Sequence, residues 1–576
     1  MLPFFADFKA FSLTLLVLLM LPSAAQNPVN NQQDVFKKTE YYLSFPSGQA
    51  EIILRDKQGI SVDYLDPKRQ RLFVYANQEG FQTIKGSGTS FRFERAPGYQ
   101  FEKNDYNMLN NIDVTQIDQW DFYPTYEAYE EMMEQFEQVF PDLCQKLEVK
   151  TLASGRKLIF ARITSNVEVE GKKPGFMYTS TMHGDETTGF NLSLRLIHYL
   201  LNNYGTDDEV THLLDNLEIW ICPLENPDGT YTNDNSTVYG ATRYNSNGID
   251  LNRNYPAIIG SPQGTLQEES EGMIEVMNGH HFIMSANIHG GIECVNYPWD
   301  SWTSDEKKHA DHDWWNLVMH EYADTARFFS PSNYMDPQGS SFFNGVTHGG
   351  DWYVVYGSRQ DYANYFEQQR EFTLEISNTK LLPTALLPDH WDYNFRSMIN
   401  YMKQSLYGIQ GRVVDVNSQE PIRAEVVLIG HDKDNSQVYS SAATGRFYRP
   451  VLAGEYTVRV TADGYPHKII NNVLVENYSS IFLDVKLGEP VNVAELNRQD
   501  HQMLHPNPAD GILWVNPKSP VTVVETLHIY DLQGKLVFET SGKLSGSIDI
   551  SHLPDATYVV KMTTPEGNIT EKLLKR

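Results

Sequence analysis

The sequence predicts an α/β domain with a mixed, mostly parallel sheet flanked by helices, preceded by a small β-rich unit and followed by two small all-β domains. Within residues 119–405, short apolar runs suit strands that are covered on both faces. Helical stretches lie between these runs, whereas the flanking regions show strand and turn patterns. The four runs are "FMYTST", "EIWICPL", "FIMSANI" and "FTLEI".

Length and composition agree with several folded domains. A chain of 576 residues exceeds one hydrophobic core and suggests about three or four domains at ~150 residues each. Its 41% hydrophobic and 12% aromatic content is typical of packed globular protein. The formal net charge of −28 argues against nucleic acid or an anionic membrane as a partner.

The first residues have the pattern of an export signal. The run "FSLTLLVLLMLP" is too short to cross a bilayer, and the small residues Ser23, Ala24 and Ala25 follow it as a cleavage signal. We therefore expect residues 1–25 to be a signal peptide and the mature protein to be exported, with no transmembrane segment. Residues 26–118 then carry short alternating segments between glycine-rich turns, which predicts the β-rich unit.

The elements of the central domain begin with an amphipathic helix in "YPTYEAYEEMMEQFEQVF". Thr125 is its expected cap, and Met132, Phe136 and Val139 recur at helical spacing. A second helix is expected in "NLSLRLIHYLLNNY". Beyond the central domain, residues 406–488 show short strands separated by turn signals, which predicts a β-sandwich, and residues 503–576 form a last β-rich unit.

Three cysteines, Cys144, Cys222 and Cys294, lie far apart in the sequence and match no C-x-x-C pattern. An odd count cannot complete a disulfide framework, so one bridge or none is compatible with the sequence. Buried thiols that pack as small hydrophobic groups are the preferred interpretation.

Polar residues that can bind a metal follow two of the predicted strands. "FMYTST" leads into His183 and Glu186, and "FIMSANI" leads into His289. Ligands in α/β sheets bind at the carboxyl ends of the strands, so these three side chains are expected at one edge. Two histidines and a carboxylate, with a fourth position open to water, are typical of a catalytic zinc site. His280 and His281 are rivals for the third ligand, but they precede the strand and would lie at its other end.

The chain resembles the zinc metallocarboxypeptidases, in particular the regulatory branch that includes carboxypeptidases E, N and D. The resemblance covers residues 119–405 and continues into the following β-sandwich. Six blocks occur in the family's order: "MHGDETTG", "NPDGTY", "TRYNSNGIDLNRNYP", "SANIHGGIECVNYPWD", "DWYVVYGSRQDY" and "FTLEIS". It implies the carboxypeptidase fold, one zinc ion per chain on His183, Glu186 and His289, and hydrolysis of the C-terminal peptide bond.

The same resemblance assigns roles to further residues. Glu375 matches the general base that takes a proton from water, and Arg243 matches the arginine that stabilises the oxyanion. Asn252 and Arg253 match the pair that binds the free C-terminal carboxylate, for which a guanidinium fork is well suited. Tyr353 matches the mobile tyrosine that closes over the bound residue.

Substrate preference is implied by two positions. Asp300 and Gln360 fall where the regulatory branch reads a basic side chain, so release of C-terminal Lys or Arg is expected. Asp300 as a simple turn residue is the competing interpretation. The chain departs from its relatives at Asp185, where Asn is frequent, and at Phe190, where Arg is common.

The flanking regions also resemble known domains. Residues 26–118 occupy the place of a pro-segment in other secreted carboxypeptidases, which implies a cover for the active-site mouth or an aid to folding. Residues 406–488 resemble a transthyretin-like domain. Residues 503–576, with the start at Pro506 and the "YDLQGK" hairpin, resemble the C-terminal sorting domain of type IX secretion substrates. This implies contact with the secretion machinery, passage across an outer membrane, and removal of the tail.

Two other functions remain as alternatives to release of Lys or Arg from peptides and proteins. One is a catalytically silent surface binding protein on the same scaffold, which should lack a zinc ligand or the base. The other is a zinc peptidase that trims cell-wall peptides. Retention of Glu375 weighs against the first, and the pair Asp300 and Gln360 weighs against the second.

Overall fold

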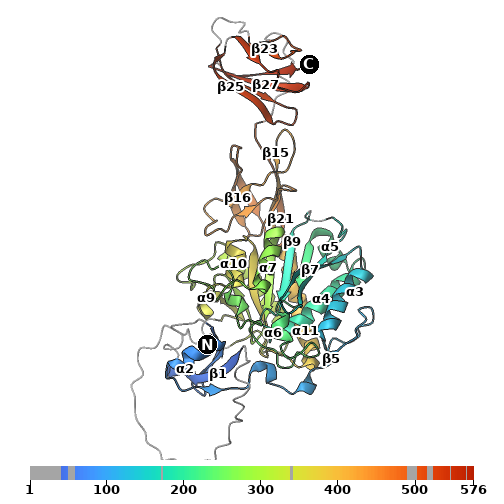
Figure 1. Cartoon of the computed structure of the whole chain (residues 1–576), viewed down its shortest axis with the longest axis vertical. Coiled ribbons are helices and arrows are strands. Elements are labelled where there is room, and N and C mark those ends of the chain that lie inside the picture. The colour runs from blue at the N-terminus through green and yellow to red at the C-terminus, as the bar shows by residue number, and fades with distance from the viewer. Residues whose placement is uncertain are drawn as a thin grey trace, which may run out of the picture.

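The computed structural model describes residues 40–576 except 50–58, 170, 172, 338–341, 490–502, 516–522, 545 and 566. The predicted signal peptide, residues 1–25, lies outside the described residues. Four units follow one another along the chain, and Figure 1 shows the N-terminal unit and the two C-terminal units at opposite ends of the central domain.

The central domain is built on one eight-stranded sheet. Its strands are β7 (Cys144–Thr151), β8 (Lys157–Ile163), β9 (Gly175–Ser180), β10 (Glu218–Cys222), β11 (Phe282–His289), β12 (Ile292–Tyr297), β13 (Val346–His348) and β14 (Arg370–Ser377). Their order across the sheet is β13-β12-β14-β11-β9-β10-β8-β7. Strand β9 pairs parallel with β10 and β11, β11 with β14, and β12 with β13, while the other pairs are antiparallel. The predicted mixed sheet is confirmed.

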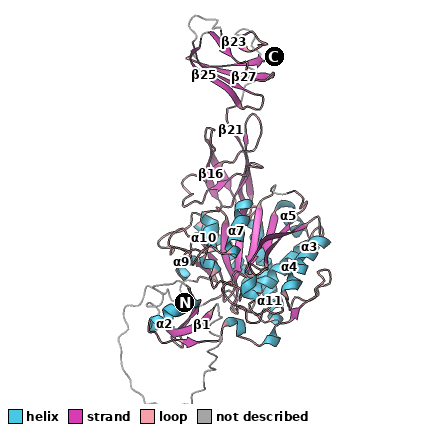
Figure 2. Cartoon of the chain, viewed as in Figure 1, coloured by secondary structure: helices cyan, strands magenta, loops and turns pink. Residues whose placement is uncertain are grey.

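Helices cover both faces of this sheet (Figure 2). The helices are α3 (Tyr126–Val139), α4 (Thr188–Asn203), α5 (Asp208–Asn216), α6 (Pro227–Thr230), α7 (Glu268–Gly279), α8 (His312–Phe328), α9 (Gly349–Trp352), α10 (Arg359–Tyr365) and α11 (Leu387–Gln404), with short 3-10 turns η4 (Leu251–Arg253) and η5 (Thr384–Leu386). Helices α3, α4, α8 and α11 contribute to one hydrophobic cluster, and α7 and α10 contribute to a second. The sheet therefore lies between two apolar layers, as its continuous hydrophobic strands require.

Helix α3 shows how the local sequence determines an element. Thr125 caps it, because its side-chain oxygen accepts a hydrogen bond from the Ala128 backbone N–H. Met132 and Phe136 are buried in the main core, as the helical spacing predicts. Val139 is 42% exposed, so its predicted place on the buried face is wrong. It is the last helical residue, and the core ends before it.

The N-terminal unit is a four-stranded sheet with one helix. Its elements are β1 (Tyr41–Pro46), η1 (Ser47–Gln49), β2 (Ile60–Asp66), β3 (Arg71–Ala76), α2 (Gln78–Gly86) and β4 (Arg92–Phe93), and the strand order is β2-β3-β1-β4. Beyond β4 the chain continues through η2 (Pro97–Tyr99), η3 (Lys103–Asp105), β5 (Met108–Leu109) and β6 (Tyr123–Pro124). Tyr106, Ile112 and Trp120 are buried in the core of the central domain. Tyr106 and Ile112 therefore pack with the central domain, although they fall within the predicted N-terminal unit, which ends at residue 118.

The two C-terminal units each consist of two sheets. The first contains β15 (Gly408–Asp415), β16 (Glu425–Leu428), β17 (Val438–Tyr439), β18 (Arg446–Arg449), β19 (Gly454–Thr461), β20 (Lys468–Val475) and β21 (Ser480–Leu487), in sheets β18-β15-β21 and β17-β16-β19-β20. The second contains β22 (Leu504–His505), β23 (Ile512–Val515), β24 (Val524–Tyr530), β25 (Leu536–Leu544), β26 (Gly546–Asp549), β27 (Thr557–Thr564) and β28 (Gly567–Leu574), in sheets β22-β23-β26 and β25-β24-β27-β28. Both predicted all-β units are confirmed.

A buried ionic cluster joins the central domain to the first β-sandwich. Asp311, just before α8, accepts hydrogen bonds from the guanidinium groups of Arg370 and Arg449 at 2.8 to 3.0 Å. Arg370 belongs to the central sheet and Arg449 to the sandwich, and both are fully buried. Burial alone would raise the pKa of Asp311, but the two guanidinium charges hold it well below its usual range. The Asp311 carboxylate thus links the central domain to the first β-sandwich.

Two smaller predictions also have an outcome. The three cysteines are free and buried. Within the described ranges, no helix has both the length and the apolar character to cross a bilayer.

Candidate metal centre and active site

The candidate site lies where parallel strands end at one edge of the central sheet. His289 is the last residue of β11, and His183 follows β9 after two residues. Strands β9 and β11 are neighbours and run parallel, so their carboxyl ends bring His183, Glu186 and His289 together. His280 and His281 lie before β11, at the opposite edge, as the sequence predicts.

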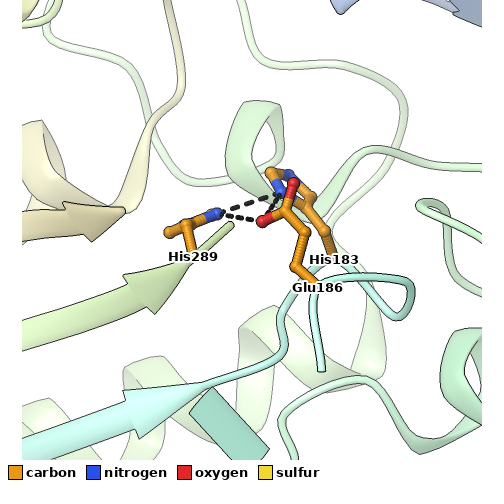
Figure 3. Close-up of side chains that lie close together, drawn as sticks. All are labelled: His183, Glu186 and His289. Atoms are coloured by element: carbon orange, nitrogen blue, oxygen red, sulfur yellow. Dashed lines mark hydrogen bonds and ion pairs between the residues drawn. The ribbon is translucent and has the colours of Figure 1, made fainter. Parts of the chain in front are cut away.

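Three potential ligand atoms converge within hydrogen-bonding distance of one another (Figure 3). The Glu186 Oε2 atom lies 2.9 Å from His183 Nδ1 and 2.7 Å from His289 Nδ1. The two imidazole Nδ1 atoms are 3.0 Å apart. All three side chains are buried, with exposures of 2–3%.

This donor set fits a zinc ion. Bonds of about 2.0–2.1 Å from a tetrahedral zinc would place such donors roughly 3.3 Å apart, close to the observed spacing. Two imidazoles and one carboxylate leave one coordination position for water or substrate, as in catalytic rather than structural zinc sites.

The turn between the ligands depends on a glycine. A Cβ atom on Gly184 would lie 2.3 Å from the backbone carbon of Gly229 and 2.5 Å from the Thr230 nitrogen. The Gly184 carbonyl accepts a hydrogen bond from the Thr230 hydroxyl at 2.9 Å. The loop after β9 can therefore approach α6 only without a side chain at this position, which sets the direction of His183.

Asp250 is a functional candidate that the sequence interpretation missed. Its Oδ1 lies 3.0 Å from His183 Nε2, so it orients the imidazole whose other nitrogen faces the cluster. Arg243 donates to Asp250 Oδ2 at 3.0 Å and to Glu186 Oε1 at 3.2 Å. Burial alone would raise the pKa of Asp250, but Arg243 and the other cations nearby hold it well below its usual range. The signal that could have identified Asp250 is its place in the "GIDLNRN" segment, between Arg243 and Asn252, which both have predicted roles.

Glu375 stands beside the cluster on β14. It is the register partner of His289 on β11. Burial raises the pKa of its carboxyl well above the usual range, and the negative charge of Glu186 adds to this effect. Its Oε2 atom has no hydrogen-bond partner among the described residues. One oxygen of the Glu375 carboxyl is therefore buried and unpartnered among the described residues, on the strand next to the candidate ligand His289.

Asp300 and Gln360, the two residues predicted to bind a basic side chain, are both buried. Gln360 Nε2 donates to Asp300 Oδ1 at 2.9 Å, and the Gln360 Oε1 accepts from the Thr373 backbone at 2.8 Å. A Cβ atom on Gly349 would lie 2.0 Å from Asp300 Oδ1, so only a glycine at this position leaves room for the Asp300 carboxyl. Burial raises the pKa of Asp300 to about 6. The structure thus brings Asp300 and Gln360 together.

The predicted carboxylate-binding pair, Asn252 and Arg253, lies between Glu186 and His289 in the sequence, and Arg253 is close to Tyr353 in space. Arg253 ends η4, and its guanidinium carbon lies 5.8 Å from the centre of the Tyr353 ring. The Asn252 side-chain oxygen accepts a hydrogen bond from the Arg359 backbone at 3.0 Å, which ties η4 to the start of α10. The pair is thereby held on the same side as the helix that carries Gln360.

The two departures from the family pattern have different surroundings. Phe190 is fully buried in the main core and packs edge-to-face on Tyr129, with 5.3 Å between ring centroids. Asp185 is buried beside the metal cluster, and its Oδ2 accepts a hydrogen bond from the Tyr75 hydroxyl at 2.8 Å. Phe190 therefore packs in the core, whereas Asp185 is hydrogen-bonded to a side chain of the N-terminal unit.

The N-terminal unit contacts the site through one group of side chains, Ser61, Asp63 and Tyr75, which we call the cap contact. Ser61 donates to Asp250 Oδ2 at 2.6 Å. The Tyr75 ring lies 5.5 Å from the Arg243 guanidinium carbon and is fully buried. Sequence reasoning missed these residues because they lie in ordinary alternating strands.

Lys380 completes the contact from the central domain. It follows β14, and its Nζ atom lies 2.9 Å from Glu186 Oε1 and 3.2 Å from Asp63 Oδ1. The same Nζ lies 5.0 Å from the centre of the Tyr75 ring. Burial alone would lower the pKa of Lys380, but the charges of Asp63 and Glu186 raise it above its ordinary value. Lys380 is therefore a charged ammonium between the metal cluster and the N-terminal unit.

Comparison with protein families identifies three of the units. Residues 129–397 match the zinc carboxypeptidase family. Residues 408–488 match the carboxypeptidase regulatory-like domain, and residues 503–576 match the secretion system C-terminal sorting domain.

Curated relatives extend the comparison. Mouse carboxypeptidase M is 33% identical over 299 residues, which is 51% of this chain and 67% of that protein. Human carboxypeptidase D is 32% identical over 359 residues, or 60% of this chain, but the match spans only 25% of that relative's length. Carboxypeptidase E of Caenorhabditis elegans is 29% identical over 403 residues, which is 62% of this chain and 85% of that protein.

Among solved structures, thrombin activatable fibrinolysis inhibitor aligns with a TM-score of 0.47 and 15% identity, over 63% of this chain and 99% of that chain. Carboxypeptidase A of Helicoverpa armigera also aligns with a TM-score of 0.47, at 17% identity, over 63% of this chain and 98% of that chain.

Proposed function

Because the chain belongs to the zinc carboxypeptidase family, we propose that it hydrolyses the C-terminal peptide bond of peptides or proteins and releases Lys or Arg. The observation that carries this proposal is the convergence of His183, Glu186 and His289 beside the unpartnered carboxylate of Glu375. The buried carboxyl of Asp300, hydrogen-bonded to Gln360, supports the basic preference.

One zinc ion per chain, held by His183, Glu186 and His289, would supply Lewis-acid polarisation of the scissile carbonyl and a more acidic water. Glu375 accepts the proton of the attacking water, since its free oxygen is buried at the same edge of the sheet. Arg243 donates hydrogen bonds to Glu186 and Asp250, which hold its guanidinium group beside the candidate metal ligands. From there it can stabilise the oxyanion that forms as the carbonyl carbon becomes tetrahedral. The proton then passes from Glu375 to the leaving amine.

Recognition of the free C-terminus falls to η4 and its surroundings. Arg253 offers a planar pair of N–H donors to the carboxylate, and Asn252 lies next to it on the same turn. Tyr353, whose ring faces Arg253, closes the bound residue off from solvent. Asp300 receives the substrate's ammonium or guanidinium group, and Gln360 orients the Asp300 carboxylate.

We also propose that the N-terminal unit restrains this site in the full chain. Three observations support this role. Tyr75 is hydrogen-bonded to Asp185, Ser61 to Asp250, and Asp63 is paired with Lys380. All three partners lie within the immediate surroundings of the metal cluster, so a long peptide could reach the cluster only after these contacts open.

The sorting domain places the chain among proteins that type IX secretion exports to the cell surface or the medium. The proposed substrates are therefore peptides and protein C-termini outside the cell, and the sorting domain is the proposed contact with the secretion machinery.

Paired peptides test the proposed reaction. The zinc-loaded full chain is incubated with peptides that end in Arg, Lys, Phe or Glu, each with a free carboxylate and each as the C-terminal amide. We expect loss of one residue from the Arg and Lys peptides with a free carboxylate. Cleavage of the amidated peptides at equal rates would reject the exopeptidase assignment.

A further inference from the structure

The environment of Lys380 is the starting point. The ammonium group is buried, with a side-chain exposure of 9%, and its partners are Glu186, Asp63 and the Tyr75 ring. Two of these three partners belong to the N-terminal unit. If that unit moves away, Lys380 loses the carboxylate of Asp63 and keeps its ion pair with Glu186 Oε1, the oxygen that faces away from the histidines, together with the charge of nearby Asp185.

The position of the cap contact relative to the specificity pocket indicates what replaces Asp63. The cap contact binds Asp185, Asp250 and Lys380, all around the metal cluster. Asp300 and Gln360 instead bond to each other, next to α9 and α10. In the proposed binding mode, a peptide with its last side chain at Asp300 and its last peptide bond at the candidate metal ligands continues toward the groups that Tyr75 and Asp63 now cover.

We propose that Lys380 determines specificity on the amino side of the scissile bond, where it pairs with an acidic side chain of the substrate in the place of Asp63. The inference rests on the proposed function and adds a substrate class to it: peptides that end in Lys or Arg and carry Asp or Glu at one of the two preceding positions. Asp63 is then an internal stand-in for this acidic residue.

The physical basis is the pairing of a partly desolvated cation. Lys380 as a whole residue is 7% exposed in the closed chain, and a bound peptide that takes the place of the cap contact covers it again, so the new ion pair also forms largely out of bulk water, where it is worth more than at an exposed surface. A neutral residue in the place of Asp63 leaves the ammonium with one carboxylate in ion-pair contact instead of two. We expect roughly a tenfold preference for the acidic peptide over its neutral counterpart, typical of one close charge pair at an interface.

The test compares two peptides that end in Arg and differ only in Glu or Gln at one of the two preceding positions. Their dissociation constants are measured by calorimetry on the zinc-loaded full chain with Glu375→Gln, which removes the base but keeps its shape. Their kcat/KM values are measured on the chain with native Glu375. Asp63→Asn is added to both forms to release Lys380 from its internal partner.

Substitutions of Lys380 provide the decisive comparison. We call the affinity or kcat/KM for the Glu peptide divided by that for the Gln peptide the Glu-to-Gln ratio. Lys380→Met should bring this ratio close to one, and Lys380→Arg should keep the preference for Glu. Lys380→Glu should instead favour a peptide with Lys at that position. Lys150→Met serves as the matched control, because Lys150 pairs with Glu271 and Glu275 beside β7, the far edge strand of the sheet. Zinc content and thermal unfolding of each variant show that it is folded.

Each result has a defined meaning. A Glu-to-Gln ratio that is the same in Lys380→Met as in the Asp63→Asn chain with native Lys380 overturns the inference, and so does a ratio of one in the latter chain. Normal release of Arg with such a flat ratio leaves the proposed reaction intact. Preferential binding of the Glu peptide without any release of Arg upholds the Lys380 assignment and rejects the proposed reaction alone.

Discussion

His289 and Glu375 are register partners on the neighbouring parallel strands β11 and β14. One is a candidate metal ligand at the end of its strand, and the other is the candidate base. Parallel hydrogen bonding holds their backbones at a set distance, so the base is positioned against the cluster by the sheet itself and not by a loop.

Removal of one metal ligand should abolish both zinc binding and turnover. We expect His289→Ala to lose the bound zinc, because two protein ligands do not retain a catalytic zinc ion. Metal content by mass spectrometry and release of Arg measure the two effects. His281→Ala is the control, since His281 lies at the other edge of the sheet. Full activity of His289→Ala would contradict the ligand assignment.

The base should be separable from the metal. Glu375→Gln keeps the size of the side chain but cannot accept a proton, so we expect zinc and substrate to bind while kcat falls by about 10²–10⁴-fold. Single-turnover kinetics together with calorimetric binding distinguish these steps. Native kcat in this variant would remove Glu375 from the reaction.

The pocket acid should act on basic substrates alone. Asp300→Ala should lower kcat/KM for Arg- and Lys-ended peptides by ~10²–10³-fold, or ~3–4 kcal/mol, while Leu- and Phe-ended peptides lose little. Gln360→Ala should have a smaller effect in the same direction, because a neutral amide only orients the acid. A uniform loss on all four peptides would instead show that Asp300 supports the fold of its turn.

Specificity should also depend on pH. Burial raises the pKa of Asp300 to about 6, so the neutral acid predominates below that value and the carboxylate above it. Since only the carboxylate pairs with a cation, the ratio of kcat/KM for Arg- over Leu-ended peptides should rise as the pH increases through about 6. The ratio cancels titration of the metal centre. A flat ratio that matches that of Asp300→Asn would refute this origin.

Loosening the N-terminal unit should raise activity of the full chain. Tyr75→Ala removes a hydrogen bond to Asp185 and a ring that faces two cations, which are together worth ~1.5–3 kcal/mol, so kcat/KM should increase by about tenfold or more. Tyr64→Ala is the control, since Tyr64 is 38% exposed and stacks on Phe73 within the same unit. Equal kcat/KM in the native chain and Tyr75→Ala would show that the unit does not restrain the site.

The sequence predicts those parts of the fold that depend on local pattern. Continuous apolar runs identify β9, β10, β11 and β14, and the hydroxyl of Thr125 identifies the start of α3. His183 and His289 each follow a predicted strand, and neighbouring parallel strands have their carboxyl ends at the same edge of a sheet. The sequence alone therefore predicts that the two histidines lie together.

The sequence does not predict contacts between segments that are far apart in the chain. Tyr75 and Asp63 are spaced like any residues in an alternating strand, and only the docked N-terminal unit shows that they face Asp185 and Lys380. Asp250 was overlooked for a related reason. A carboxylate that orients a ligand histidine has no spacing rule of its own, since its partner His183 is 67 residues away.

The most direct test of the account is zinc-dependent loss of a single residue, followed by mass spectrometry. The full chain is stripped of metal with a chelator, dialysed, and supplied with one equivalent of zinc or with none, and then given a peptide that ends in Glu-Arg with a free carboxylate. The account predicts a product shorter by one arginine only in the zinc-loaded sample, with no internal cleavage. Equal loss of arginine in the metal-free sample, or cleavage within the peptide, would contradict it.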